Sequence, residues 1–316
     1  MASLANDGKN STGYIFLDDS NLMVKEALQN HFEPGSRQEP VDIRACDFDD
    51  AQFHVLVTAD KPSEVLVSIQ MPCYAELFSC GAENVLVDKF EGMFSAEPVE
   101  GYDLTLKVSL ESMKGTIEET IENISRLKTI IASSPFQTAF EALNAGTCGN
   151  LPPMAFQPRP TENLYLIPSS DRVVVTFVLD FPDPTDTAIA RVFLQEFSEA
   201  QRTVRRAPPV SFTRGPGREL EQFGVTSEQS DGNVLGYLTF TILPSHVSSD
   251  RVDKTVSMLA SFRNYLHYHI KASKSHLHSR MRSRVTSLLG ALSSARMKNN
   301  VIKEKKTAKG KTFTRR

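Results

Sequence analysis

The hydrophobic pattern near the C-terminus predicts one long helix, from residue 251 to about residue 296. A serine- and aspartate-rich stretch at 248–250 can cap its start, and no proline or glycine follows before Gly290. At 1.5 Å per residue, such a helix is about 70 Å long. Its apolar positions step by three and four and therefore share one face: Val252, Val256, Leu259, Phe262, Leu266, Ile270, Leu277, Met281, Val285, Leu288 and Leu292.

The first half of this helix is apolar on the opposite face as well. Met258, Tyr265, Tyr268 and Ala272 fall there. An amphipathic surface helix needs only one buried stripe, so a second one implies that another body packs against it. That body is either a second layer of this chain or a separate subunit. We therefore assign subunit packing to nine residues of the helix: Val256, Leu259, Phe262, Tyr265, Leu266, Tyr268, Ile270, Leu277 and Met281.

The rest of the chain predicts alternating strands and helices in two halves. In the first half we expect helices at 21–32, 84–90, 116–132 and 136–143, the last two separated by Pro135, and strands at 41–45, 53–58, 65–69 and 102–110. In the second half we expect strands at 164–167, 173–181, 210–213 and 235–243, a helix at 184–206, and a mobile Gly-, Glu- and Gln-rich loop at 214–232. Residues 144–160 are rich in glycine and proline and read as a linker.

The order of elements repeats. Each half runs through a hairpin, a helix, a strand that opens with Gly-Tyr, and a longer helix. This predicts an α+β fold of two similar domains, each an antiparallel sheet flanked by helices, with a long C-terminal α-helix. The predicted limits are 1–20 for a disordered N-terminal extension, 21–146 and 147–250 for the domains, 251–297 for the interaction helix and 298–316 for a basic tail.

The charge is divided between two parts of the chain. Residues 271–316 hold fourteen Lys and Arg and one acid, whereas the whole chain has a net charge of −3. A strongly basic arm therefore follows an acidic body. Arg280 and Arg284 flank the apolar stripe on one side, and Lys271 and Arg282 flank it on the other. A solvated charge run is one reading; the size of the imbalance favours a helix that binds an acidic partner.

Composition and cysteine content indicate an intracellular globular protein. No apolar run approaches the ~20 residues that span a bilayer, and the N-terminus lacks the apolar core of a signal peptide. The four cysteines show no CxxC pair or zinc-like spacing. We expect them to be reduced and buried, and we expect the protein in the cytoplasm.

The candidate motifs for metal and phosphate binding do not have the residue spacing that these sites require. Four histidines at 267, 269, 276 and 278 have no i,i+3 or i,i+4 pair. The aspartates at 47, 49 and 50 lack the glycine of a calcium loop, and Gly310-Lys311-Thr312 lacks the first glycine of a phosphate loop. We therefore expect no catalytic residue, cofactor or metal. Because catalytic triads assemble from distant residues, an enzyme is disfavoured and not excluded.

A nucleic-acid-binding protein is the main alternative. A basic helix interleaved with Tyr and His can follow a phosphate backbone. However, these aromatic residues lie on a helix and not on a sheet platform, and no RNA-binding signature is present.

Several stretches of the sequence are similar to one known family. They are FRNYLHYHIK at 262–271, Ser273-Lys274, HSRMR at 278–282, FLQEF at 193–197, APPV at 207–210 with Phe212, GYLTF at 236–240 and GKTF at 310–313, with a looser match over 47–54. Together they resemble the family of subunit 2 of the actin-related protein 2/3 complex, over about 22–313.

The resemblance implies a non-catalytic role. It implies a heterodimer core with subunit 4, whose helix lies antiparallel to the C-terminal helix, and contacts with the two actin-related proteins and the side of the mother actin filament. It places the protein in the cytoplasm and the actin cytoskeleton, with no membrane span and no nucleic acid. The residues we expect to meet actin are Lys271, Lys274, Arg280, Arg282 and Arg284.

Overall fold

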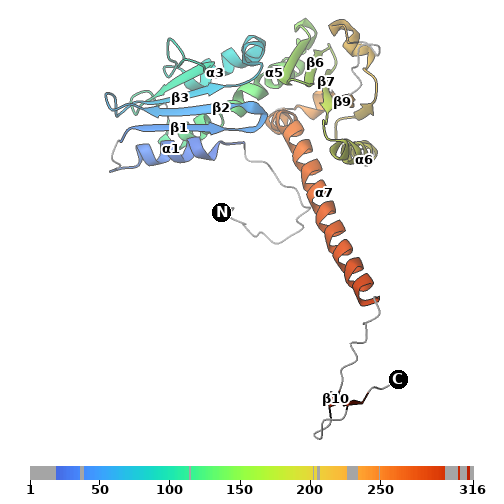
Figure 1. Ribbon diagram of the computed structural model, residues 1–316. Coiled ribbons are helices and arrows are strands. Elements are labelled where there is room, and N and C mark those ends of the chain that lie inside the picture. The colour runs from blue at the N-terminus through green and yellow to red at the C-terminus, as the bar shows by residue number, and fades with distance from the viewer. Residues whose placement is uncertain are drawn as a thin grey trace. The chain divides into compact units, whose positions relative to one another are not determined.

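Two antiparallel sheets and one long helix dominate the computed structural model (Figure 1). It describes residues 19–35, 39–113, 115–201, 203–204, 207–225, 234–248 and 250–295, with 305–306 and 312–313. The first sheet has the order β1-β2-β3-β4, with bounds Val41–Cys46, Gln52–Val57, Val65–Gln70 and Leu104–Val108. The second has the order β5-β6-β7-β9-β8, with bounds Met154–Arg159, Glu162–Pro168, Val173–Asp180, Val234–Ile242 and Val210–Thr213. The predicted α+β class is confirmed.

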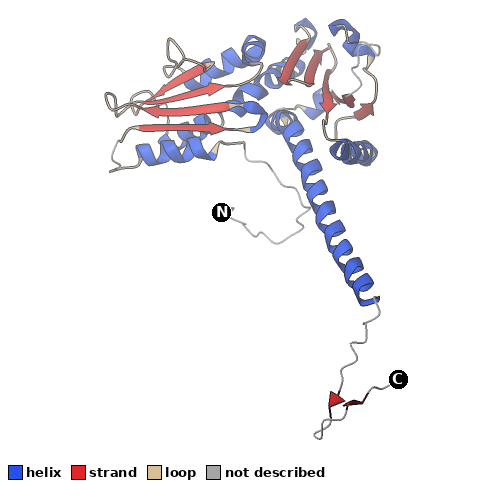
Figure 2. Ribbon diagram, in the orientation of Figure 1, coloured by secondary structure: helices blue, strands red, loops and turns tan. Residues whose placement is uncertain are grey.

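Helices alternate with strands in both halves of the chain and are drawn in blue in Figure 2. In the first half they are α1 (Leu22–Phe32), α2 (Tyr74–Leu77), α3 (Glu83–Phe90), α4 (Ile117–Ser125) and α5 (Leu127–Asn144). In the second half they are α6 (Pro184–Gln201) and α7 (Val252–Ala295). Short helical turns occupy Phe48–Asp50, Phe78–Ala82, Cys148–Asn150, Arg218–Phe223 and Pro244–His246. The predicted long C-terminal helix is therefore present, and it continues through Gly290.

The first sheet is apolar on one face and polar on the other. Phe53, Val55 and Val57 of β2 are buried, as are Ile121 and Ile124 of α4 and Leu127 and Ile131 of α5. The alternate positions of β1 (Asp42, Arg44 and Cys46) are exposed. This alternation is what an antiparallel sheet with helices on one face requires.

The two sheets repeat the same strand order. In both, the first strand pairs with the second, the second with the third, and the third with the last strand of that half, β4 or β9. The second sheet has one more strand, β8, which follows α6 and pairs with β9. The two Gly-Tyr pairs are not equivalent, because Gly101 precedes β4 whereas Gly236 lies inside β9. A Cβ on Gly236 would lie 2.6 Å from the Thr213 carbonyl oxygen, so glycine is needed there for β8 to approach β9.

The chain separates into two units, residues 1–268 and 269–316, and the boundary falls inside α7. The domain limits given above stay predictions. Of the predicted N-terminal extension, residues 1–18 lie outside the described residues, as does residue 296 at the predicted end of the helix. Within the predicted basic tail, the described residues form two short paired strands, β10 (Lys305–Lys306) and β11 (Thr312–Phe313).

The predicted linker at 144–160 is wrong in part, because it contains strand β5. Pro153, Pro158 and Pro160 suggested a break in secondary structure. However, among the described strands β5 lies at the edge of its sheet and pairs with β6 alone, and an edge strand tolerates a proline whose nitrogen lies on the solvent side. The register also shifts between Phe156 and Arg159, so the pairing is irregular near Pro158.

The predicted break at Pro135 is also wrong, since α5 runs through it from Leu127 to Asn144. A proline at 135 cannot donate to the carbonyl of Ile131. The Ser134 hydroxyl donates to that carbonyl instead, at 2.7 Å, and Ser134 is buried. The helix changes direction earlier, at Arg126, where φ is −96° and ψ is 11°.

Two smaller predictions also need correction. Only Cys148 is buried; Cys46 is exposed on the polar face of β1, and Cys73 and Cys80 are half-buried. The predicted loop at 214–232 contains a helical turn whose Leu220 is buried against Tyr165 and Tyr237. Residues 226–232 of that loop lie outside the described residues.

Replacing Ser134 with Ala should destabilise the protein by about 1.5 kcal/mol, because the Ile131 carbonyl loses its donor inside the core. Ser133→Ala is the matched control. The Ser133 hydroxyl donates to the Ile130 carbonyl, which the backbone N–H of Ser134 can also reach, so we expect a change within about 0.5 kcal/mol. Urea unfolding of both variants would measure the difference, and equal losses would contradict this account of how α5 accommodates Pro135.

Candidate functional site

The long helix α7 carries the residues that the sequence singled out, and they fall into two groups. Val256, Leu259, Phe262, Leu266 and Ile270 are all buried. From Lys271 to Ser294, every residue is exposed except the half-buried Lys274. The helix therefore changes character after Ile270, from a core element to a surface element.

The buried stripe packs mainly through Phe262. Its ring centroid lies 5.0 Å from that of Phe240 on β9, 5.3 Å from that of Phe177 on β7 and 5.9 Å from that of Phe197 on α6. The angles between ring planes, 45° to 78°, are those of tilted and edge-to-face pairs. The second sheet thus covers the first face of α7.

The nine residues assigned to subunit packing differ in how far they are buried. Val256, Leu259, Phe262, Leu266 and Ile270 belong to the core of the chain itself, which is the first of the two alternatives left open by the sequence. Tyr265 and Tyr268 are half-buried. Leu277 and Met281 are exposed on the described surface.

The exposed part of α7 continues the same stripe. Leu277, Met281, Val285, Leu288 and Leu292 share the helix face of Ile270, and their side chains are between 42% and 61% exposed. Over fifteen residues this stripe is about 22 Å long. Isolated surface leucines need no explanation, but an apolar row of this length on a solvent-facing helix indicates an interface.

Basic residues border this stripe. Lys271, Arg280, Arg282 and Arg284 are exposed, and Lys274 is half-buried. No Asp or Glu occurs between 271 and 294. None of the ion pairs between described residues involves Arg280, Arg282 or Arg284.

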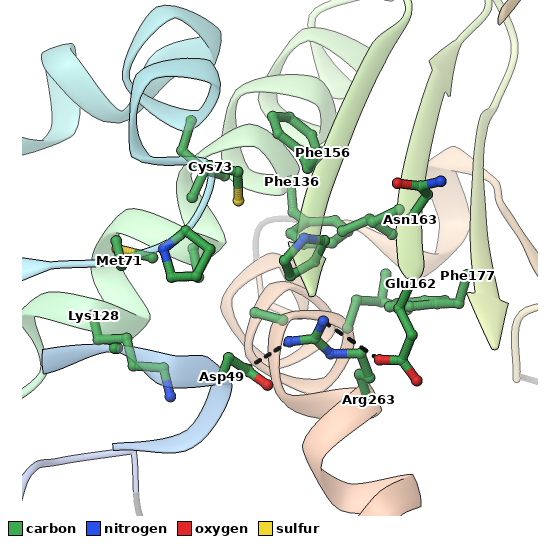
Figure 3. Close-up of a pocket in the computed structure, with 18 residues that line it drawn as sticks. Asp49, Met71, Cys73, Lys128, Phe136, Phe156, Glu162, Asn163, Phe177 and Arg263 are labelled. Atoms are coloured by element: carbon green, nitrogen blue, oxygen red, sulfur yellow. Dashed lines mark ion pairs between the residues drawn. The ribbon is translucent and has the colours of Figure 1, made fainter. Parts of the chain in front are cut away.

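A cluster of buried charges joins α7 to both sheets (Figure 3). Arg263 of α7 places Nη2 2.6 Å from Asp49 Oδ2, and Nη1 3.6 Å from Glu162 Oε2. Arg159 Nη2 lies 2.9 Å from Asp49 Oδ1, and His267 Nε2 lies 2.8 Å from Glu162 Oε1. Asp49 follows the first strand of the first sheet, whereas Arg159 and Glu162 flank the β5–β6 turn of the second.

Asp49, at the centre of this cluster, has a left-handed backbone and a mostly buried, ionised side chain. Its backbone is left-handed, with φ of 63°, and its side chain is 13% exposed. Burial opposes the ionised form, but Arg263, Lys128 and Arg159 together with a hydrogen bond from Asn264 outweigh it and lower the pKa of Asp49. The carboxylate is therefore charged at neutral pH and connects the two sheets to the helix.

A small cavity of about 70 Å³ adjoins the cluster. Its lining comes from both sheets, from α5 and from α7, and includes Met71, Cys73, Phe136, Phe156 and Phe177 (Figure 3). Burial raises the pKa of the Cys73 thiol to about 12, so this thiol is protonated and unreactive. A mostly apolar cavity of this size, whose charges are paired with each other, has the character of a packing defect between two layers.

The described residues contain no group of three or more His, Cys, Asp or Glu placed to hold a metal ion. His267 bonds to Glu162, and His276 and His278 are exposed. Burial lowers the pKa of the half-buried His269. Across the described part of the chain, no helix combines the length and apolar content needed to cross a membrane.

Comparison with known proteins identifies the family. The family model described as "Arp2/3 complex, 34 kD subunit p34-Arc" matches residues 67–299, which include all of α7. The chain belongs to this family. Over 301 residues it is 32% identical to actin-related protein 2/3 complex subunit 2 of Dictyostelium discoideum, a match that covers 95% of this chain and 99% of that protein. Over 323 residues it is 33% identical to the subunit of the same name in Schizosaccharomyces pombe, with the same coverage. The predicted resemblance to this family is confirmed.

Sequence reasoning missed the charge cluster of this p34-Arc chain. Asp49 drew attention only as part of a failed calcium loop, while Arg159 and Arg263 had no local signature. Their partners lie 110 and 214 positions away in the sequence. The only available signal was Arg263 itself, a charged residue among the apolar positions of α7.

Removing the charge of Asp49 should destabilise the protein. Asp49→Asn keeps the size and tolerates the left-handed backbone, but it removes the carboxylate nearest to Arg263 and Arg159 and leaves Glu162 alone opposite both arginines, at a cost of about 3 kcal/mol. Asp50→Asn is the matched control: Asp50 is exposed and also left-handed (φ 56°), so we expect less than about 0.5 kcal/mol. Equal unfolding midpoints for the two variants would contradict the cluster's structural role.

The stability of wild type and of Asp49→Asn, measured at several pH values, gives a second test. Because the folded-state pKa of Asp49 is lowered, its stabilising contribution is complete above the unfolded value of about 3.9 and is lost as pH falls through the folded value. The stability difference between wild type and Asp49→Asn should therefore be constant from pH 7 to about pH 5 and shrink below about pH 4. A difference that stays constant at acidic pH would show that Asp49 is not ionised in the folded protein.

Proposed function

We propose that this chain is a non-catalytic structural subunit of the actin-related protein 2/3 complex, which pairs with subunit 4 and contacts the side of the mother actin filament. The observation that supports this most strongly is the exposed half of α7. It carries an unpartnered apolar row and a set of cations on one continuous helix, in a chain of the p34-Arc family.

The apolar row supports the pairing with subunit 4. Leu277, Met281, Val285, Leu288 and Leu292 recur at the spacing with which one helix packs against another. Burying five such side chains contributes several kcal/mol, enough to hold two helices together when the rest of the interface adds to it. An antiparallel helix of subunit 4 would cover this row along its length.

The cations support the filament contact. Arg280 and Arg284 lie on one side of the apolar row, and Lys271 and Arg282 lie on the other. A helix packed on its apolar row would still direct these side chains outward. Actin is acidic, so complementary charge would speed docking and fix its orientation more than it would add affinity.

The other partners and the location follow from the same assignment. The two actin-related proteins would lie against the remainder of the chain, in the cytoplasm, within branched actin networks. Nucleotide would belong to those subunits, and this chain would need no cofactor of its own. Branched actin nucleation would use it as a scaffold.

Reversing the three outer arginines should separate filament binding from assembly. In the purified complex, Arg280→Glu, Arg282→Glu and Arg284→Glu together should weaken cosedimentation with actin filaments at least tenfold at low salt, since they convert attraction into repulsion. All three residues are exposed, so the complex should still assemble. The matched control reverses three exposed cations elsewhere, Lys61, Lys89 and Arg172. Unchanged cosedimentation would defeat the filament proposal, and tight binding of RNA by the wild type would favour the nucleic-acid alternative.

Placing charges in the apolar row should block assembly. With Met281→Asp and Leu288→Asp, coexpressed subunit 4 should no longer copurify, because two carboxylates would be desolvated in the helix interface. Ser279→Asp and Ser283→Asp introduce the same charges away from the row and should leave copurification intact. If both pairs of substitutions retain subunit 4 equally, the row is not its binding site.

A further inference from the structure

Two polar atoms beside the cavity between the sheets lack hydrogen bonds. Glu162 of β6 and Arg263 of α7 both line this cavity and face each other (Figure 3). Both residues are more than nine-tenths buried, with exposed fractions of 2% and 8%. Glu162 Oε2 and Arg263 Nη1 have no hydrogen-bond partner among the described residues. They lie 3.6 Å apart, close enough for an ion pair but too far for a direct hydrogen bond.

The other ends of these two side chains are already held. Glu162 Oε1 lies 2.8 Å from His267 Nε2, and Arg263 Nη2 lies 2.6 Å from Asp49 Oδ2. Arg159 Nε is 3.9 Å from Glu162 Oε2, which is also beyond hydrogen-bonding distance. Because these contacts fix both side chains, the unsatisfied acceptor and donor cannot turn to other protein groups. A third group that lies against both atoms would satisfy them together.

The charges around the cavity favour a neutral ligand. The cations and the carboxylates that pair with each other there are equal in number: Lys128, Arg159 and Arg263 oppose Asp47, Asp49 and Glu162. An additional ion would lose its hydration without gaining a free counter-charge, which is costly in a buried site. A neutral ligand with one donor and one acceptor adds the missing hydrogen bonds and leaves this balance intact.

The rest of the wall sets the size of the ligand and its apolar part. Met71, Phe136, Phe156 and Phe177 lie on this wall (Figure 3). The cavity volume of about 70 Å³ is roughly half that of an engineered apolar cavity of about 150 Å³ that binds benzene in another protein. Since benzene has six carbon atoms, the space suits a molecule of about three or four non-hydrogen atoms.

We propose that this cavity is a binding site for a small primary amide, of which acetamide is a simple example. The amide N–H donates to Glu162 Oε2, the amide carbonyl oxygen accepts from Arg263 Nη1, and the methyl group lies against the aromatic wall. Both unsatisfied atoms gain a partner and no charge is added. Because Glu162 begins β6 and Arg263 belongs to α7, the bound amide also holds α7 to the second sheet and opposes local opening there.

A matched pair of probes tests the hydrogen bonds. Acetone has nearly the size and shape of acetamide but lacks the N–H donor, so it leaves Glu162 Oε2 unsatisfied. Saturation-transfer NMR titrations of the full chain, purified with its partner subunits, should show that acetamide binds about tenfold more tightly than acetone. Acetone is the more apolar probe, so apolar packing alone predicts the reverse order. Equal binding, tighter binding of acetone, or no saturation transfer to acetamide would overturn the proposal.

A cavity-filling substitution tests the location. Ala260 lines the cavity, and Ala260→Leu should weaken acetamide binding at least tenfold by occupying the space. Ala188→Leu adds the same side chain at an exposed position of α6 and should leave binding unchanged. Acetamide binding that survives Ala260→Leu, or that both substitutions weaken equally, would place the ligand elsewhere and refute the site.

Hydrogen exchange of the wild-type protein gives a measurement that depends on no variant. Acetamide should slow the exchange of backbone amides in peptides covering 156–166 and 257–267, which carry Glu162 and Arg263, and should leave the peptide covering 22–32 unchanged. Exchange that acetamide does not slow in these two segments would contradict binding between them.

Discussion

The packing of one helical stripe against the second sheet is the interaction on which the other features depend. Phe262 contacts Phe177, Phe197 and Phe240, and this contact fixes which face of α7 is turned inward. Within the first half of α7, this contact turns Val256, Leu259 and Leu266 into the core and leaves Met258 at the surface.

The buried charges beside this packing add specificity at a small net gain in stability. Arg263 would cost free energy in the core if Asp49 and Glu162 did not oppose it, and Asp49 would cost free energy without its arginines. Such a cluster tolerates few other arrangements, because every member needs its partner within hydrogen-bonding distance. Apolar packing alone is not directional and would allow the two sheets to slide past each other. Arg263 restricts that motion, because it pairs with Asp49 beside the first sheet and with Glu162 of the second.

The sequence predicted those elements whose periodicity is long and uninterrupted. The stripe of α7 and the hairpins β2–β3 and β6–β7 follow from local patterns. The misassigned elements were those in which a distant partner overrides a local rule: Ser134 supplies the donor that Pro135 lacks, and β6 accepts a proline-bearing edge strand. The charge cluster could not be predicted, since Asp49, the pair Arg159 and Glu162, and the pair Arg263 and His267 are distant from one another in the sequence and share no motif. The same holds for the division of the apolar stripe, because periodicity identifies a face and does not tell which layer covers it.

A shared helix also constrains how the family can vary in length. Between Ile270 and Leu277, one inserted or deleted residue would turn the outer row by about 100° relative to the inner stripe, and the arginines would face where the leucines had been. Seven residues are almost two full turns, and eleven are about three, so a change of either size would nearly restore the phase. The stretch that links core to surface is therefore expected to accept substitutions freely while keeping its residue count.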